Sequence, residues 1–209
     1  MQGLEEHMGR VRQYLADKYA ARERALTLCR EAIRHSANSI RAVHRGEYDK
    51  AEDLKSQARD RLDEVRKALV GHPDVFFAGF LSDAEKEYVE ASATFAIIAG
   101  QPLPDPDALG TSYVAYLHGL GETVGELRRH LLDIIRHGEV TRCEELLGAM
   151  EEIYSALVTM DFPDGMTGGL RRTTDVARGI LEKTRGDLTM ALRQRDLEAR
   201  LNEFERRLP

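Results

Sequence analysis

The sequence contains little of what β-sheet and disulfide-stabilised proteins depend on. Its 209 residues include no Trp, six Pro and two Cys, and aromatic residues make up 6% of the chain. Ala, Leu, Arg and Glu are abundant instead, and this balance favours an all-helical protein. The cysteines, Cys29 and Cys143, stand apart with no C-x-x-C spacing, which indicates buried free thiols in a reducing compartment rather than a disulfide.

Long apolar runs and a secretory leader are also missing. The longest apolar runs fall well short of the roughly 18 residues that a membrane-spanning helix needs. The first residues, Met1 to Glu6, have neither the basic start nor the apolar stretch of a signal peptide. We therefore expect a cytoplasmic protein with no membrane partner. The length is enough for one large domain with a substantial core, so residues 1–209 are expected to form a single domain.

Positive charge is scarce overall but concentrated in one place. The formal net charge of -6 argues against a protein that coats nucleic acid through bulk positive charge. On the first helical segment, however, four arginines fall within an arc of about 60° at 100° per residue. These four, called the arginine row below, are Arg30, Arg34, Arg41 and Arg45. The row is either an ordinary solvated face or a surface that follows a phosphate backbone.

Helical periodicity and its interruptions predict an antiparallel bundle of about six to seven helices. The expected helices cover approximately residues 5–44, 50–69, 85–99, 112–137, 139–160 and 170–207. In the first helix the core stripe is expected to consist of Val11, Leu15, Leu26, Ile33 and Ile40. Ser82, followed three residues later by Glu85, predicts a capping box that opens the third helix. The late part of the last helix is apolar enough to pack against another subunit.

The third helix combines an apolar body with two acids. Residues 91–99 are all apolar or small, and a helix that is apolar all round is buried inside a bundle. Glu87 and Glu90, three residues apart, lie on one face of its first turns. A carboxylate near a core is costly unless a cation or hydrogen-bond donors compensate its charge.

A second acidic pair, Glu122 and Glu126, lies on one face of the fourth helix. Three glycines surround it, at 119, 121 and 125, although each glycine inside a helix costs about 1 kcal/mol relative to alanine. They allow either simple close helix packing or the approach of a partner helix and a phosphate. If the third and fourth helices are antiparallel neighbours, the four carboxylates come within reach of Mg²⁺ or Mn²⁺, which prefer hard oxygen ligands. The same spacings also occur on helices that bind no metal.

Three segments carry a resemblance to a known family. Residues 87–91 read E-Y-V-E-A, which resembles a signature of translin-associated factor X. Residues 116–127 read Y-L-H-G-L-G-E-T-V-G-E-L, similar to that family's Y-L-x-G-x-x-D-x-x-G-E-L segment. Residues 170–185 are similar to archaeal members of the translin family, and the helix layout fits over essentially the whole length.

The resemblance implies a seven-helix α-fold that assembles into a hollow homo-oligomer, typically an octamer, holding single-stranded RNA or DNA. In the factor X branch, acidic residues bind Mg²⁺ and cut RNA. Glu87 and Glu90 match the family's paired glutamates, Glu126 matches a later glutamate, and Glu122 stands where the family has Asp. This last difference lengthens the side chain by one methylene. Translin's segment rich in His and Arg has no counterpart here, so the arginine row is the candidate nucleic-acid contact.

The resulting hypothesis is a metal-dependent endoribonuclease that acts on single-stranded RNA inside an oligomeric shell. Its catalytic and metal-binding residues would be Glu87, Glu90, Glu122 and Glu126. His118 either orients water or phosphate beside them or is a plain helix-surface histidine. Two other functions stay open: a non-catalytic translin-like protein that only binds single strands, and an all-α NTP pyrophosphohydrolase that also uses paired acids. A ferritin-like di-iron protein is disfavoured because neither pair is followed by His at E-x-x-H spacing.

Overall fold

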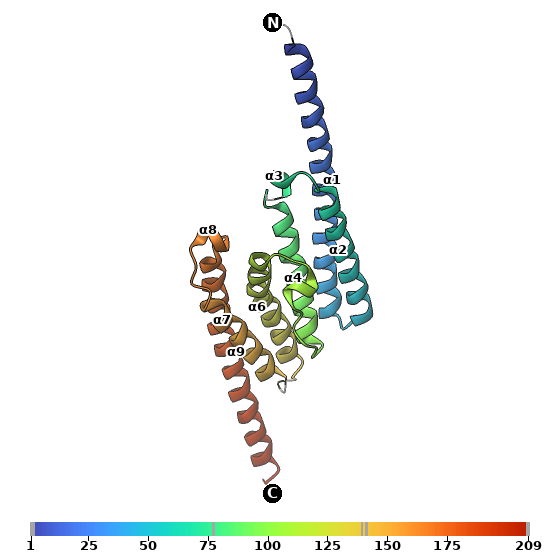
Figure 1. Ribbon diagram of the computed structural model, residues 1–209. Coiled ribbons are helices and arrows are strands. Elements are labelled where there is room, and N and C mark those ends of the chain that lie inside the picture. The colour runs from blue at the N-terminus through green and yellow to red at the C-terminus, as the bar shows by residue number, and fades with distance from the viewer. Residues whose placement is uncertain (1–2, 77, 139, 141, 208–209) are drawn as a thin grey trace. The chain divides into compact units, whose positions relative to one another are not determined.

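The computed structural model describes residues 3–76, 78–138, 140 and 142–207, and every regular element in these ranges is an α-helix. Six helices are long: α1 (Leu4–His44), α2 (Tyr48–Ala68), α4 (Phe80–Ile98), α6 (Tyr113–Arg136), α7 (Cys143–Val158) and α9 (Leu170–Glu205). Three others have a single turn: α3 (Pro73–Phe76), α5 (Pro106–Leu109) and α8 (Asp164–Thr167). The all-α prediction is confirmed (Figure 1).

The described helices belong to two compact units. One consists of Met1–Phe95 with Leu103–Gly119, and the other of Ala96–Pro102 with Leu120–Pro209. Helices α4 and α6 each begin in the first unit and continue without a break into the second. That residues 1–209 act as a single domain stays a prediction.

In the first unit, α1 and α2 form an antiparallel hairpin. The chain turns at Gly46, whose φ of +72° lies in the left-handed region that glycine adopts without strain. Small side chains on the facing surfaces, such as Ala25, Ala32 and Ala58, are fully buried and let the two helices approach closely. The Ser39 hydroxyl donates to the backbone oxygen of Ala51 at 2.8 Å. Leu62, Val65, Tyr88 and Val89 join this core from α2 and α4.

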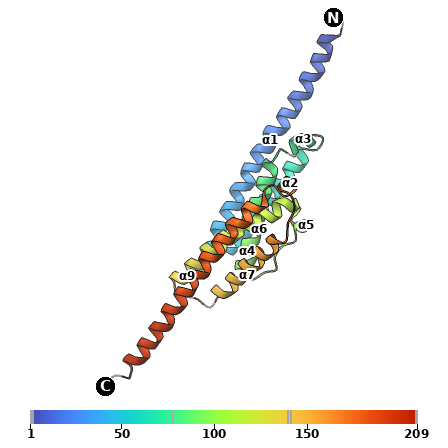
Figure 2. The same cartoon turned by 90° about the vertical axis from the view of Figure 1, so that its left-hand side faces the viewer.

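The N-terminal part of α1 extends past α2, as Figure 2 shows. Helix α1 has 41 residues and α2 only 21, so α2 covers only the C-terminal half of α1. The expected core stripe is therefore wrong at its start, because Val11 is 47% and Leu15 is 53% exposed. Further along the stripe, Ile40 is buried as expected.

Helix α4 is buried along most of its length, as the sequence predicted. Residues 91–96 and Ile98 are each at most 4% exposed. The predicted capping box is wrong, because α4 begins at Phe80 and Ser82 therefore lies inside the helix. No helix in the described ranges is both long and apolar enough to cross a membrane.

The second unit packs the later turns of α6 with α7, α8 and α9. Leu127, Leu131, Leu146 and Leu188 are almost completely buried there. The predicted helix over residues 139–160 begins at Cys143, and Glu139 and Thr141 lie outside the described residues. Towards its C-terminal end α9 exposes apolar side chains. They are Met190, Leu197, Leu201 and Phe204.

Both cysteines are free and buried, as predicted. Burial is the largest cause that raises the pKa of the Cys29 thiol to about 12, and the charge of Glu85 is the second. Burial likewise raises the pKa of Cys143. A thiol with a raised pKa is almost entirely protonated at neutral pH and is therefore a poor nucleophile.

Candidate metal centre

The acids of α4 lie on the side of an otherwise buried helix. Glu87 and Glu90 are half-buried, while Tyr88 and Val89 between them are at most 3% exposed. The buried pair fixes the rotation of α4, so its two glutamates keep a common direction one turn apart. Lys86 places its Nζ 3.6 Å from Oε1 of Glu87.

Helix α6 lies unusually close to α4 at Gly119. A Cβ atom added at this glycine would lie 2.6 Å from the Val89 Cβ and 2.7 Å from the Lys86 backbone oxygen. Contacts below 3.0 Å essentially never occur between real Cβ atoms and their neighbours. The glycine therefore has a packing role, and of the two explanations that the sequence left open, close helix packing applies at this position.

The contacts also fix the direction of the two helices within the first unit. Near the start of α4, Glu85 Oε2 accepts a hydrogen bond from the Ser112 N–H at 3.0 Å, directly before α6 begins. Further along both helices, Val89 meets Gly119. Because both contacts advance in the same sense, α4 and α6 are parallel. The sequence brought the four acids together on the condition that these two helices are antiparallel neighbours, and that condition is not met.

Three of the four predicted acids form one group that could hold a metal ion. Glu87, Glu90 and Glu122 are all half-buried, and each offers one carboxylate oxygen that lies within 4.8 Å of the other two. Because α6 is unbroken, Glu122 lies one turn after Gly119. The close approach at Gly119 therefore sets the position of the Glu122 backbone. Three carboxylates without His or Cys are a donor set suited to Mg²⁺ or Mn²⁺.

Glu126 is not part of this group. It lies one turn beyond Glu122, and its Oε2 is 3.6 Å from Nη1 of Arg129. His118 is half-buried on α6, beside Gly119. The metal role of Glu126 and the orienting role of His118 both stay predictions.

Glu85, near this centre on α4, has a role that the sequence did not predict. The residue is 5% exposed, and its carboxylate takes part in two interactions. Arg66 of α2 donates from Nη2 to Oε1 at 2.8 Å, and the Ser112 N–H donates to Oε2. The signal was present, since this glutamate stands shortly before the apolar residues 91–99 of a buried helix, but capping offered a simpler explanation for it.

The arginine row is exposed along the C-terminal half of α1. Arg45 binds Glu47 through two hydrogen bonds of 2.6 and 3.1 Å, and the pKa of Glu47 falls to about 2 because of Arg45 first and Lys50 second. Arg41 donates to Asn38 at 2.7 Å. Arg30 and Arg34 form no hydrogen bond or ion pair with the described part of the chain. These two arginines are thus available to an external anion.

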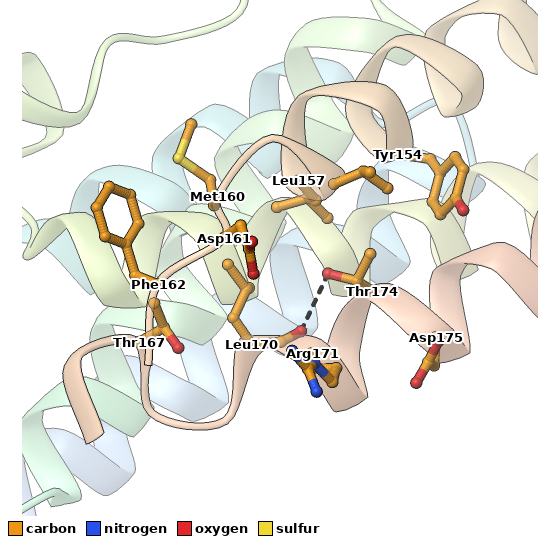
Figure 3. A pocket seen from close by; sticks show the side chains of 11 residues that line it. Tyr154, Leu157, Met160, Asp161, Phe162, Thr167, Leu170, Arg171, Thr174 and Asp175 are labelled. Atoms are coloured by element: carbon orange, nitrogen blue, oxygen red, sulfur yellow. Dashed lines mark hydrogen bonds between the residues drawn. The ribbon is translucent and has the colours of Figure 1, made fainter. Parts of the chain in front are cut away.

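A separate pocket of about 170 Å³ lies in the second unit. It is enclosed by the end of α7, the segment before α8 and the start of α9 (Figure 3). Leu157 and Leu170 are among the residues that line it, and the Thr174 hydroxyl donates to the Leu170 backbone oxygen at 3.0 Å. None of the predicted catalytic or nucleic-acid-binding residues lines this pocket.

Comparison with known proteins identifies the family. No family model matches the chain. The uncharacterized protein MJ0175 of Methanocaldococcus jannaschii is 32% identical over 199 residues, covering 92% of this chain and 86% of that protein. The structure of AfC3PO in complex with duplex RNA is 36% identical, with a TM-score of 0.83, and the match covers 90% of this chain and 98% of that chain. The chain belongs to the translin–C3PO family.

Two further structures agree with this assignment. The crystal structure of AfC3PO is 35% identical with a TM-score of 0.83, again covering 90% of this translin–C3PO chain and 98% of that chain. Apo-NeC3PO has a TM-score of 0.74 with coverage of 91% and 98%, and at 20% identity it shows a likeness of fold alone. The resemblance to translin-associated factor X drawn from the sequence is confirmed at the level of the family.

Proposed function

We propose that this translin–C3PO chain is a Mg²⁺- or Mn²⁺-dependent endoribonuclease that cuts single-stranded RNA within a homo-oligomer. The observation that carries the proposal is the group of three half-buried carboxylates, Glu87, Glu90 and Glu122. Three carboxylates this close repel one another, and a bound divalent cation would offset that repulsion.

The residues at such a centre would have different roles. Glu87, Glu90 and Glu122 would hold the cation, and Glu126, one turn further along α6, would contribute from its edge. When bound, a divalent cation lowers the pKa of a coordinated water and offsets the negative charge of a phosphate. The buried side chains of Tyr88 and Val89 fix the rotation of α4 and so keep its two carboxylates on one side of the helix.

The RNA partner is supported by charge and by a relative. AfC3PO has been solved with duplex RNA, and the exposed arginine row offers this chain a positive surface for a phosphate backbone. Contacts to phosphate position a nucleic acid without reading its sequence. We therefore propose that the row binds single-stranded RNA, or single-stranded DNA of the same backbone spacing, with little sequence preference.

Exposed apolar side chains support assembly with further copies. The start of α1 exposes Leu4, Met8, Val11 and Leu15, and the end of α9 exposes Leu197, Leu201 and Phe204. Contiguous apolar surface of this kind is typical of protein–protein contacts. An octamer, as the family resemblance implies, is the assembly we propose.

The deciding experiment compares cleavage and binding in one preparation. An end-labelled single-stranded RNA is incubated with the protein in Mg²⁺ or in EDTA, and products are resolved on a denaturing gel. Cleavage is expected in Mg²⁺ only, and Glu90→Gln should abolish it while leaving RNA affinity within about twofold. Glu152→Gln, which changes an exposed glutamate on α7, is the matched control and should cleave normally.

Two results would reject the nuclease assignment. Binding of RNA without cleavage would leave a non-catalytic single-strand binder. Release of pyrophosphate from an NTP, with RNA left intact, would favour the pyrophosphohydrolase instead. Cleavage that persists undiminished in Glu90→Gln would show that the reaction takes place elsewhere.

A further inference from the structure

A buried ion pair holds the beginning of α6 against α4 without joining the metal centre. The Glu85 side chain is 6% exposed and that of Arg66 is 24% exposed, with 2.8 Å between Oε1 and Nη2. Arg66 is itself held by Asp63, at 2.8 Å from Nη1 to Oδ1. The other Glu85 oxygen accepts from the Ser112 N–H at 3.0 Å. One carboxylate thus connects α2, α4 and the start of α6.

The geometry of the Ser112 contact suits a carboxylate. Ser112 directly precedes α6, and its own hydroxyl accepts from the Ala115 N–H at 3.3 Å. The backbone N–H groups at a helix start lack partners within the helix, and the helix dipole favours negative charge there. A charge buried this deeply is kept only where it is well paired, so the arrangement specifies one position for the start of α6.

The contact between Glu85 and Ser112 lies on the same faces of α4 and α6 as the close approach at Gly119, which is next to the metal centre. Ser112 and Gly119 are seven residues apart, which is close to two helical turns, so both lie on one side of α6. On α4, Glu85 and Val89 are one turn apart on one side. The Glu85 bridge and the close approach at Gly119 are therefore two successive attachments of α6 to α4. Glu122 comes one turn after the second attachment.

We propose that Glu85, held by Arg66, is a positioning residue that sets α6 on α4 so that Glu122 reaches the metal held by Glu87 and Glu90. This inference rests on the proposed function. It distinguishes Glu85 from the three ligands, because Glu85 acts through the backbone of α6 and does not touch the cation. Supporting residues of this kind commonly change metal affinity by about 10- to 100-fold when they are altered.

The test measures Mn²⁺ binding by isothermal titration calorimetry, alongside thermal unfolding and RNA affinity, on the full chain. Glu85→Gln keeps the length of the side chain and removes its charge. It is expected to weaken Mn²⁺ binding by about 10- to 100-fold while RNA affinity stays within twofold. Arg66→Lys retains a cation beside Glu85 and should keep most of the Mn²⁺ affinity of the unaltered protein. It is the second variant if Glu85→Gln does not fold.

The matched control is Asp187→Asn. It removes the ion-pair partner of Arg128, another α6 residue, whose Nη2 lies 2.7 Å from the Asp187 carboxylate on α9. The hydrogen bond from Arg128 Nη1 to the Thr184 hydroxyl remains. This change weakens a contact between α6 and α9 but none between α6 and α4. If it lowers the melting temperature as much as Glu85→Gln does, it should still leave Mn²⁺ affinity unchanged. Equal weakening in both variants would overturn the positioning role, because general stability would then explain the loss.

Two further outcomes separate this inference from the proposed function. If the unaltered protein binds Mn²⁺ and loses it in Glu90→Gln, but Glu85→Gln binds normally, only the positioning role is refuted. If the unaltered protein binds no Mn²⁺, the metal centre itself is refuted, and the positioning role with it.

Discussion

Replacing Gly119 by alanine tests the closeness of α4 and α6 directly. The new Cβ would lie 2.6 Å from the Val89 Cβ and 2.7 Å from the Lys86 backbone oxygen. Carbon atoms in ordinary contact are about 3.5–4.0 Å apart, so the helices must separate by roughly 1 Å. The backbone oxygen of Lys86 belongs to a helix and cannot move aside alone.

The expected change in stability follows from two opposing contributions. Alanine in a helix is favoured over glycine by about 0.5–1 kcal/mol. Overpacking a close contact costs about 1–3 kcal/mol. Gly119→Ala should therefore lower the free energy of unfolding by up to about 2 kcal/mol. Gly125→Ala, on the same helix, is the control, because its Cβ would meet Ile180 at an ordinary 3.9 Å; it should stabilise the protein slightly.

The functional effect should exceed the effect on stability. A displacement of about 1 Å at a reacting centre can cost on the order of 100-fold in rate, and Glu122 is one turn from the altered residue. Urea unfolding followed by circular dichroism measures the first effect. Mn²⁺ calorimetry and RNA cleavage measure the second. If Gly119→Ala were as stable as Gly125→Ala and bound Mn²⁺ normally, the close parallel packing of α4 and α6 would be refuted.

Three other perturbations follow from the described residues. The double variant Arg30→Ala/Arg34→Ala should weaken RNA binding and reduce the slope of log K against log salt by roughly 1.4, about 0.7 per single-strand phosphate contact; an unchanged slope in fluorescence anisotropy would exclude both residues. For Cys29, the pKa rises from 9.0 to about 12 on folding, so its contribution to the free energy of unfolding is complete below pH 9 and is lost as pH rises towards 12. In Cys29→Ala the free energy of unfolding, measured with urea at several pH values, should fall less steeply between pH 9 and about 12 than in the unaltered protein. An equally steep fall would show that Cys29 does not cause this loss of stability. Leu15→Asp should reduce the mass found by analytical ultracentrifugation without lowering helix content, and an unchanged mass would remove the α1 end from the subunit contacts.

Sequence periodicity predicted the helices well because it reports local geometry. The long helices begin and end close to the expected residues, except that α4 begins earlier, at Phe80, and α7 later, at Cys143. Residues 91–96 are buried as their composition required. The start of α1 differs for a tertiary reason. Val11 and Leu15 follow the helical period, but α2 is too short to cover them. Periodicity indicates which face of a helix is apolar, and it does not indicate whether the partner for that face lies in the same chain.

The role of Glu85 was hidden for a similar reason. Its spacing from Ser82 matches a capping box, which is a local interaction, whereas its partners Arg66 and Ser112 are 19 and 27 residues away. The capping box and the observed contact with Ser112 both place a glutamate near a helix start. Only the three-dimensional structure shows that Glu85 accepts a hydrogen bond from the N–H directly before α6 rather than from the start of α4.

The direction of α6 explains which of its two glutamates joins the group. Had α4 and α6 been antiparallel with their ends aligned, Glu90, ten residues into α4, would have faced the late turns of α6 near Glu126. The segment between the helices instead carries the chain back, through α5, to the start of α4, and Ser112 meets Glu85 there. In this parallel register the turn that follows Gly119 faces Glu87 and Glu90, and that turn holds Glu122. Glu126 lies about 6 Å further along the axis, at 1.5 Å per residue, which accounts for its absence from the group of three carboxylates.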